Sequence, residues 1–405
     1  MPDQPARPSE RRGPALFSKV PQVTVFFWVI KVLCTTVGET ASDFLNVNVG
    51  LGLRGTSLAA AACLLIVLLV QFGVKRYIPA VYWLTVVLIS VFGTLITDIL
   101  TDSLRFPLEA STVIFSVALG LTFAAWYAKE KTLSIHSIFT RRREVFYWLA
   151  ILFTFALGTA TGDLVAEKLG LGYLITGFIV LGIIMGAAIA WRLGLDPVLA
   201  FWIAYILTRP LGASLGDYLT QSKADGGLGL GATVTSAGFL LAILAVVIYL
   251  GATGKDAVDE VPAPTETHGR RTVLQVVVVI SVLLGLGVTG YFMRSAQLQA
   301  QATASASPDR PLGDLSAFRG IAQDMRGLVG AADWAGAKLG AGRLETAWDE
   351  GQAQLQRMSP KDWTVMDDAI DVVLRTTRSS SQDPSTSTAA LQSLLAVIDS
   401  LDRPK

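Results

Sequence analysis

Long apolar runs alternate with short polar links over the first three quarters of the chain. Between residues 23 and 292 the runs come close to, or exceed, the ~18 residues that predict a membrane-spanning helix. Lipid offers no partners for free backbone N–H and C=O groups, and the sequence lacks the alternation of a membrane barrel, so the runs predict helices. Residues 294–405 are polar and have the periodicity of water-soluble helices.

One pattern of aromatic residues, glycine and aspartate occurs four times in the apolar part. In each copy an aromatic residue precedes Trp, Gly follows that Trp by ten residues, and Asp follows it by fifteen. The tryptophans are Trp28, Trp83, Trp148 and Trp202, and the aspartates are Asp43, Asp98, Asp163 and Asp217. A second apolar run follows each copy, so each repeat predicts a helical hairpin and the four predict eight spans. Val273–Phe292 predicts a ninth span.

These elements predict an all-α, polytopic membrane protein with a soluble helical bundle at its C-terminus. Within a membrane domain at 21–253, the four parallel repeats cover about 21–78, 79–131, 143–194 and 197–253. Around it we expect a disordered basic leader (1–20), a linker (254–271), the ninth helix (272–293), a second linker (294–311) and the bundle (312–405).

Composition supports this class and excludes others. The chain is 52% apolar and 16% charged, and its mean hydropathy is +0.52, whereas soluble domains carry about 25% charged residues. A net charge of +1 without a basic domain argues against a nucleic-acid partner. Nucleotide-binding and hydrolase motifs are missing, and no nucleophile–base pair lies in the spans, so we do not expect an enzyme. Two cysteines in apolar runs imply no disulfide framework.

The distribution of Lys and Arg predicts the orientation. With the N-terminus inside, the inner segments hold 15 of these residues and the outer links hold four. The positive-inside rule therefore predicts a cytoplasmic N-terminus and, after nine spans, a bundle on the outer side. The tryptophans then fall at the inner interface, where aromatic rings are enriched.

The four copies, with the opening KVPQVTVFFWVIKVLCTTVGETASDFL, resemble a bacterial family of uncharacterised membrane-anchored proteins built from a repeat of unknown function. The resemblance covers about residues 19–250 and implies no established activity. For a bacterial protein with these spans we expect a multi-pass protein of the inner membrane, and the orientation predicted from Lys and Arg places the bundle in the periplasm or outside the cell. Evidence for a function must therefore come from the residues themselves.

The four aspartates lie in an unfavourable position. Fifteen helical residues span about 22 Å, so each Asp reaches the outer third of a hydrocarbon core about 30 Å thick. The C-terminal end of a helix already carries partial negative charge. A carboxylate there needs a bound cation, a basic partner or a proton. Glu39 lies deeper in the membrane than the aspartates and is our strongest candidate for a functional acid. As an alternative, the aspartates only end each span and cap a short following helix.

Hydroxyl side chains crowd the same stretches. Carboxylate and hydroxyl oxygens are hard ligands, suited to Mg²⁺, Ca²⁺, Mn²⁺ or Na⁺. The predicted metal ligands are Glu39, Asp43, Asp98, Asp163 and Asp217, and the further predicted substrate contacts are Thr40, Thr97, Thr161 and Ser214. Beyond a bound divalent cation, no cofactor is predicted.

Two basic residues lie inside predicted spans. Lys31 is one turn from Trp28, and its side chain either extends to the headgroups or has a role in gating or in an ion pair. Arg209 lies near the middle of its span beside Pro210, where an arginine is expected to face the protein interior and find an acid. Glu39 or one of the repeat aspartates is the natural partner. In a functional role, Arg209 would lock the resting state or bind an anionic substrate. A permanent buried ion pair is the structural alternative.

Together these features predict a transporter or channel-like carrier for a small cation, with a divalent metal of the Mn or Mg class preferred. Repeat carboxylates in the outer half of the membrane would bind the cation, and protonation would be a coupling step. The alternative is a non-transporting sensor or scaffold whose external bundle binds an ion or a partner. The expected partners are the lipid bilayer and the small cation, and homo-oligomerisation is compatible with the sequence.

Overall fold

The computed structural model describes residues 18–45, 52–104, 106–220, 228–256, 270–305, 311–379 and 381–402; the side chains of Asp43 and Asp102 are among those outside this description. Every regular element in these ranges is a helix. The repeats form α1 (Val25–Asp43) and α2 (Gly52–Gly73), α3 (Pro79–Asp98) and α4 (Leu108–Glu130), α5 (Arg141–Asp163) and α6 (Tyr173–Arg192), and α7 (Pro197–Thr220) and α8 (Ala232–Thr253).

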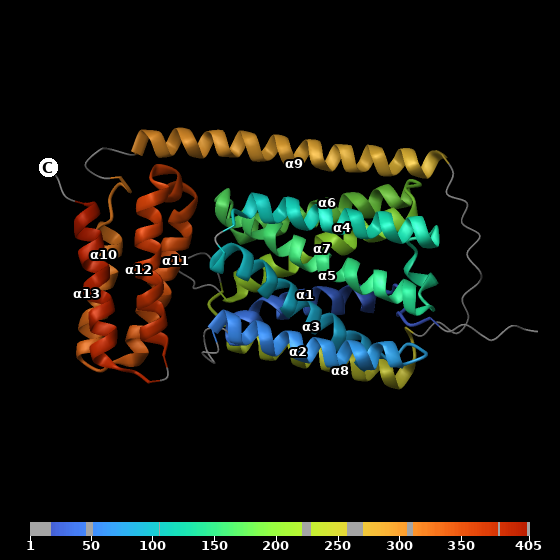
Figure 1. Cartoon of the computed structure of the whole chain (residues 1–405), viewed down its shortest axis with the longest axis horizontal. Helices are drawn as coiled ribbons and strands as arrows, with labels where there is room; N and C mark the ends of the chain where they lie inside the picture. The colour runs from blue at the N-terminus through green and yellow to red at the C-terminus, as the bar shows by residue number, and fades with distance from the viewer. Residues whose placement is uncertain are drawn as a thin grey trace, which may run out of the picture.

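The helices α1 to α8 and the following α9 (Arg270–Ser305) are the nine described helices that are long and apolar enough to cross a membrane. The chain is therefore an all-α, multi-pass membrane protein, as the hydropathy pattern predicts. A separate set of amphipathic helices follows: α10 (Ser316–Gly330), α11 (Trp334–Met358), α12 (Pro360–Arg378) and α13 (Pro384–Leu401). They pack around a core of their own and form the predicted helical bundle (Figure 1).

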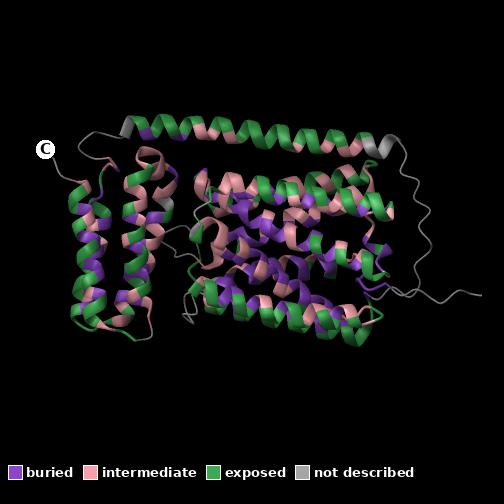
Figure 2. Ribbon diagram, viewed as in Figure 1, coloured by how far each residue is buried: buried purple, intermediate pink, exposed green. Residues whose placement is uncertain are grey.

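The first helices of the four repeats form an inner ring. α1 packs against α3 and α7, and α5 packs against the same two helices. Between 50% and 56% of each of these spans is buried, against 11–22% for α2, α4, α6 and α8. Figure 2 shows the same contrast, with buried residues concentrated in the inner helices. The ring is therefore the protein interior, and the second helices form a shell around it.

The repeats interlock rather than folding as separate hairpins. α2 packs against α3, α4 against α5, and α6 against α7, so each second helix contacts the first helix of the next repeat. α8 completes the circle by packing against α1. Each predicted hairpin is thus a repeat of the sequence, but its second helix packs against the first helix of the next repeat.

The repeat glycines allow this close packing. A Cβ added at Gly93 would lie 2.7 Å from Cβ of Phe155 in the next repeat. At Gly38, Gly158 and Gly212 the added atom would collide with the side chains of Ser90, Arg209 and Thr35 respectively. Each glycine therefore packs against the residue that lies seven positions after the Trp of the next repeat. The glycine of the fourth repeat packs in the same way against the first repeat. Small residues permit such close approach between membrane helices.

Most of the repeat tryptophans are buried between helices rather than exposed on the outer surface of the membrane domain. Trp83, Trp148 and Trp202 are at most 4% exposed, and each ring packs against an aromatic residue of the preceding repeat, edge to face in the case of Tyr147 and Trp202. Aromatic pairs gain extra stability in such geometry, which favours the interior over the membrane surface here. We call this cluster the aromatic collar and the end of the ring that contains it the aromatic end. Its members are Phe27, Trp28, Tyr82, Trp83, Tyr147, Trp148, Phe201, Trp202 and Tyr205.

Two predicted boundaries are wrong. The ninth helix does not end at 293 with a linker at 294–311, because α9 continues to Ser305 through Gln- and Ala-rich sequence with good helix propensity. The disordered leader does not reach residue 20, because Ser18, Lys19 and Val20 are buried. Residues 1–17, and most of the linker predicted at 254–271, lie outside the described residues.

Candidate functional site

The inner helices continue beyond their aspartates. α3 and α5 are followed by five-residue π-helical segments, Ile99–Ser103 and Leu164–Lys168. Neither Asp98 nor Asp163 uses its side chain to cap the segment that follows. The capping alternative is therefore wrong for these two copies. Single π-helical turns are rare and occur frequently at functional sites.

Five carboxylates lie near one another where α3 and α5 end. Asp163 interacts electrostatically with the other four, and all five are partly buried. We call them the carboxylate cluster and this end of the ring the carboxylate end. The cluster consists of Glu39, Asp98, Asp163, Glu167 and Asp217. The predicted site residue Asp43 has its side chain outside the described residues.

Arg209 lies at the centre of the ring, below the carboxylate cluster. Its guanidinium Nη2 donates to Glu39 Oε2 at 2.5 Å, to Thr159 Oγ1 at 2.7 Å and to Thr94 Oγ1. Its Nη1 donates to the carbonyl of Thr35 at 3.4 Å. One arginine of the fourth repeat thus contacts the first helix of each of the other three repeats.

The acceptors of Arg209 occupy one position of the repeat. Glu39, Thr94 and Thr159 each lie eleven residues after their Trp. Thr94 and Thr159 donate their own hydroxyl protons to backbone carbonyls, which leaves their oxygens free to accept from the guanidinium. The sequence analysis identified Glu39 and Arg209 but missed the role of these two threonines. Comparison of the repeats position by position would have placed them beside Glu39.

The Arg209–Glu39 ion pair is almost removed from water. The exposed fraction of the Arg209 side chain is 0%, and that of Glu39 is 13%. Removing one partner from a buried pair costs about 3–5 kcal/mol, whereas replacing both with apolar residues is often neutral or stabilising. Stability alone therefore gives little reason to retain the pair. Charged groups inside membrane proteins usually mark ion pathways, relays or binding sites.

Lys31 is a second buried cation. Its side chain does not extend to a headgroup, because its exposed fraction is 0%. Its Nζ lies 3.8 Å from the ring centroid of Phe155 and 4.3 Å from that of Tyr205. Nζ has no hydrogen-bond partner among the described residues. Among the described residues Lys31 therefore forms no ion pair, and its ammonium lies over the faces of two aromatic rings instead.

The predicted hydroxyl contacts serve mainly in helix packing. Thr97 of α3 donates to the carbonyl of Ala156 on the neighbouring α5 at 3.1 Å. Thr40 accepts a hydrogen bond of 2.7 Å from Ser236 of α8. The other two predicted hydroxyls are those of Ser214, which is buried, and Thr161, which is partly exposed.

Within the part of the chain that the structure describes, no three or more His, Cys, Asp or Glu side chains lie close enough together to hold a metal ion. Among the predicted metal ligands, Glu39, Asp98, Asp163 and Asp217 therefore do not form a ready-made metal site. Glu39 is instead bound to Arg209.

The soluble bundle contacts the carboxylate end. Lys168, which closes the π-helical segment after α5, donates to the Gln356 side chain of α11 at 2.5 Å. Arg357 of the same helix donates to the Lys168 carbonyl at 2.9 Å, and Arg294 of α9 donates to the Leu169 carbonyl at 2.8 Å. The bundle is therefore attached one helical turn from Asp163.

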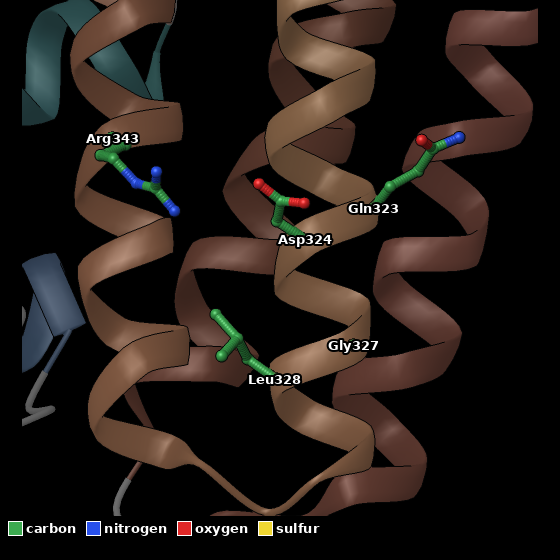
Figure 3. A pocket seen from close by; sticks show the side chains of 5 residues that line it. All are labelled: Gln323, Asp324, Gly327, Leu328 and Arg343. Carbon is green, nitrogen blue, oxygen red and sulfur yellow. The ribbon is translucent and has the colours of Figure 1, made fainter.

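A shallow hollow lies within the bundle itself. Asp324 and Arg343 present opposite charges there, beside Gln323, Gly327 and Leu328 (Figure 3). All five residues come from α10 and α11. The hollow therefore belongs to the bundle and is not a part of the ring.

The family model described as Repeat of Unknown Function (DUF347) matches the chain four times. The matches cover residues 26–77, 81–132, 146–193 and 200–256, which are the four repeats and together more than half of the chain. No curated protein and no solved structure matches the chain.

Proposed function

Because the chain belongs to the family described as Repeat of Unknown Function (DUF347), whose description assigns no activity, we propose a function from its geometry. We propose that it is a membrane carrier that moves a small cation through the inner ring. The observation that supports the proposal is the Arg209–Glu39 pair, held at the centre by Thr94 and Thr159. No enzymatic step is part of it.

In this proposal the carboxylate cluster attracts the cation and Glu39 receives it. A cleft lined by charges of one sign raises the local concentration of counter-ions. Because the Glu39 carboxylate is already paired with Arg209, an arriving cation competes with the guanidinium for it. Binding and release of Arg209 then give the ring two arrangements. Proton uptake by neighbouring carboxylates supplies the coupling step, because close carboxylates titrate as a group.

The proposed cargo is a hard cation. The cluster offers carboxylate oxygens, and the threonines at the centre offer hydroxyl oxygens. Mn²⁺ and Mg²⁺ remain the first candidates and Na⁺ the next. Since Glu39 is bound to Arg209, a divalent ion would gain its full ligand set only after the pair opens.

We further propose that the N-terminus is cytoplasmic and that the membrane is the bacterial inner membrane. The concentration of Lys and Arg in the links of the aromatic end supports this orientation. The carboxylate end and the bundle would then face the periplasm or the exterior.

Flux through reconstituted protein tests the carrier. Proteoliposomes should accumulate one of Mn²⁺, Mg²⁺ or Na⁺, and Glu39→Gln should reduce uptake to the level of empty liposomes. Asp324→Asn, which changes an acid of the soluble bundle, should transport as the parent does. If none of the three cations moves through well-folded protein, the carrier proposal is wrong.

The second candidate is a membrane-anchored sensor or scaffold. The contacts of Gln356 and Arg357 with Lys168 favour it, because they join the bundle directly to the membrane domain beside Asp163. Ligand binding to the bundle would then alter the ring without any flux. Removal of residues 294–405 would abolish a sensor's response but would leave a carrier with transport.

A further inference from the structure

A short segment before α1 lies across the aromatic end. We call Ser18–Gln22 the N-terminal strap. Its Lys19 N–H donates to the Ile138 carbonyl at 3.1 Å, and its Ser18 carbonyl accepts from the Tyr77 N–H at 3.0 Å. Its Gln22 N–H donates to the carbonyl of Asp256 at 2.9 Å. The strap thus connects the α2–α3 link, the α4–α5 link and the segment after α8.

A buried ion pair fixes the strap. Lys19 Nζ lies 2.6 Å from Glu144 Oε2, and the side-chain exposures are 7% and 1%. Gln71 donates to the second carboxylate oxygen of Glu144 at 3.1 Å, and Lys19 also donates to the carbonyl of Phe72 at 3.3 Å. Both charges are therefore satisfied by named partners while the strap is in place. Moving the strap would leave Glu144 without its cation.

The strap and the aromatic collar form two successive layers. Val20 is 1% exposed and belongs to the same hydrophobic core as the collar. Beneath it, Tyr82 of α3 and Tyr147 of the neighbouring α5 are joined by a hydrogen bond between their hydroxyls. On α1, Lys31 and Cys34 lie about one and two helical turns beyond Phe27 of the collar, and both are 0% exposed. The two layers therefore separate the centre of the ring from the solution at the aromatic end.

We propose that the N-terminal strap is the gate of the aromatic end, held closed by the Lys19–Glu144 ion pair. Rupture of the pair releases the strap and admits water, and then the cargo, to Lys31 and to the Arg209–Glu39 pair. The inference rests on the proposed carrier function for the identity of the cargo. The gate itself is defined by the strap and can be tested without any transport.

Cys34 is a native reporter for this gate. In a Cys63→Ala background it is the only cysteine of the sequence, and it lies behind both layers. A membrane-impermeant methanethiosulfonate reagent should modify it slowly in vesicles of either orientation. Lys19→Met or Glu144→Gln should speed modification about tenfold or more, a shift of about 1.4 kcal/mol in the gate equilibrium, from the strap side only.

Two further variants distinguish gate opening from general loosening. The charge exchange Lys19→Glu with Glu144→Lys should restore slow modification, because it re-forms the pair. Arg142→Met removes an exposed arginine that pairs with Glu130 at the same end, where Glu130 keeps its pair with Arg143, and should leave the rate unchanged.

The gate is disproved if Cys34 reacts at the parent rate in both single variants, or if the charge exchange reacts as fast as they do. Faster modification in the single variants, rescued by the exchange, supports the gate even if no cation flux is found. In that result the carrier function would fail while the gate would remain.

Discussion

Arg209 of α7 and Glu39 of α1 meet at the centre of the ring, 170 residues apart in sequence and 2.5 Å apart in space. Their positions break the symmetry of the repeats. Where the first repeat has Glu39, the second and third have Thr and the fourth has Ala213. A symmetrical ring of threonines would form a neutral polar centre. The ion pair instead gives the centre a charge-dependent contact that a competing ion can open.

Glu39→Gln should destabilise the protein by about 3 kcal/mol, because it leaves the Arg209 guanidinium buried without its counter-charge. Thermal unfolding in detergent measures the loss. The double variant Glu39→Gln with Arg209→Met should recover most of the stability and none of the flux. Equal stability of the single and double variants would show that the pair is not coupled.

Gly158→Ala should cost about 1–3 kcal/mol, because the new Cβ collides with the side chain of Arg209 and the helices must separate. Gly182→Ala on α6 is the matched control, since nothing lies within 4 Å of its added Cβ. This control should be neutral or stabilising by about 0.5–1 kcal/mol. Similar unfolding temperatures for the two variants would contradict the packing of α5 on α7.

Lys31→Met should leave the unfolding temperature unchanged or raise it. An ammonium without hydrogen-bond acceptors is costly to bury, and Met fills similar volume without a charge. Arg209→Met should lower the unfolding temperature, because it strands Glu39. If Lys31→Met destabilises the protein as strongly as Arg209→Met, the burial of Lys31 without a hydrogen-bond acceptor is contradicted.

Asp383, at the start of α13, should contribute stability that depends on pH. Hydrogen bonds from the hydroxyls of Thr386 and Ser385 and from the Ser385 N–H lower the pKa of Asp383 in the folded state. The contribution is therefore present above the unfolded pKa of about 4 and is lost as pH falls through the lower folded value. Asp383→Asn should unfold at a lower temperature than the parent at pH 6, and the difference should shrink towards pH 3.

Deletion of residues 294–405 should leave cation flux measurable in proteoliposomes. The inner ring and its core are built from residues before α9, and the bundle has its own core. The deletion removes the contacts of Arg294, Gln356 and Arg357 with the segment after α5. Complete loss of flux from a folded, monodisperse deletion variant would favour the sensor.

Much of the architecture could be predicted from sequence, because lipid imposes long apolar helices and the repeat shows its period directly. An acidic partner for Arg209 was also predictable, since a mid-span arginine needs an acid, although the sequence left the choice open between Glu39 and the repeat aspartates. The interlocked packing was not, because hydropathy does not specify which helix a second span contacts. Lys31 was misjudged because hydropathy gives the position of a residue along a span but not the direction its side chain faces, and Lys31 faces the interior of the ring. The strap was missed because its basic sequence is typical of unstructured leaders.

The closure of the ring by α8 against α1 has a consequence for biosynthesis. The first repeat is inserted into the membrane long before the fourth is translated. Until then Glu39 has no Arg209 to pair with, and α1 lacks two of its neighbours, α7 and α8. Three repeats alone would expose the unsatisfied edges of an incomplete circle. Nascent chains arrested before residue 209 should therefore depend on insertion chaperones or be degraded, whereas those that extend past α8 should become protease-resistant in a single step.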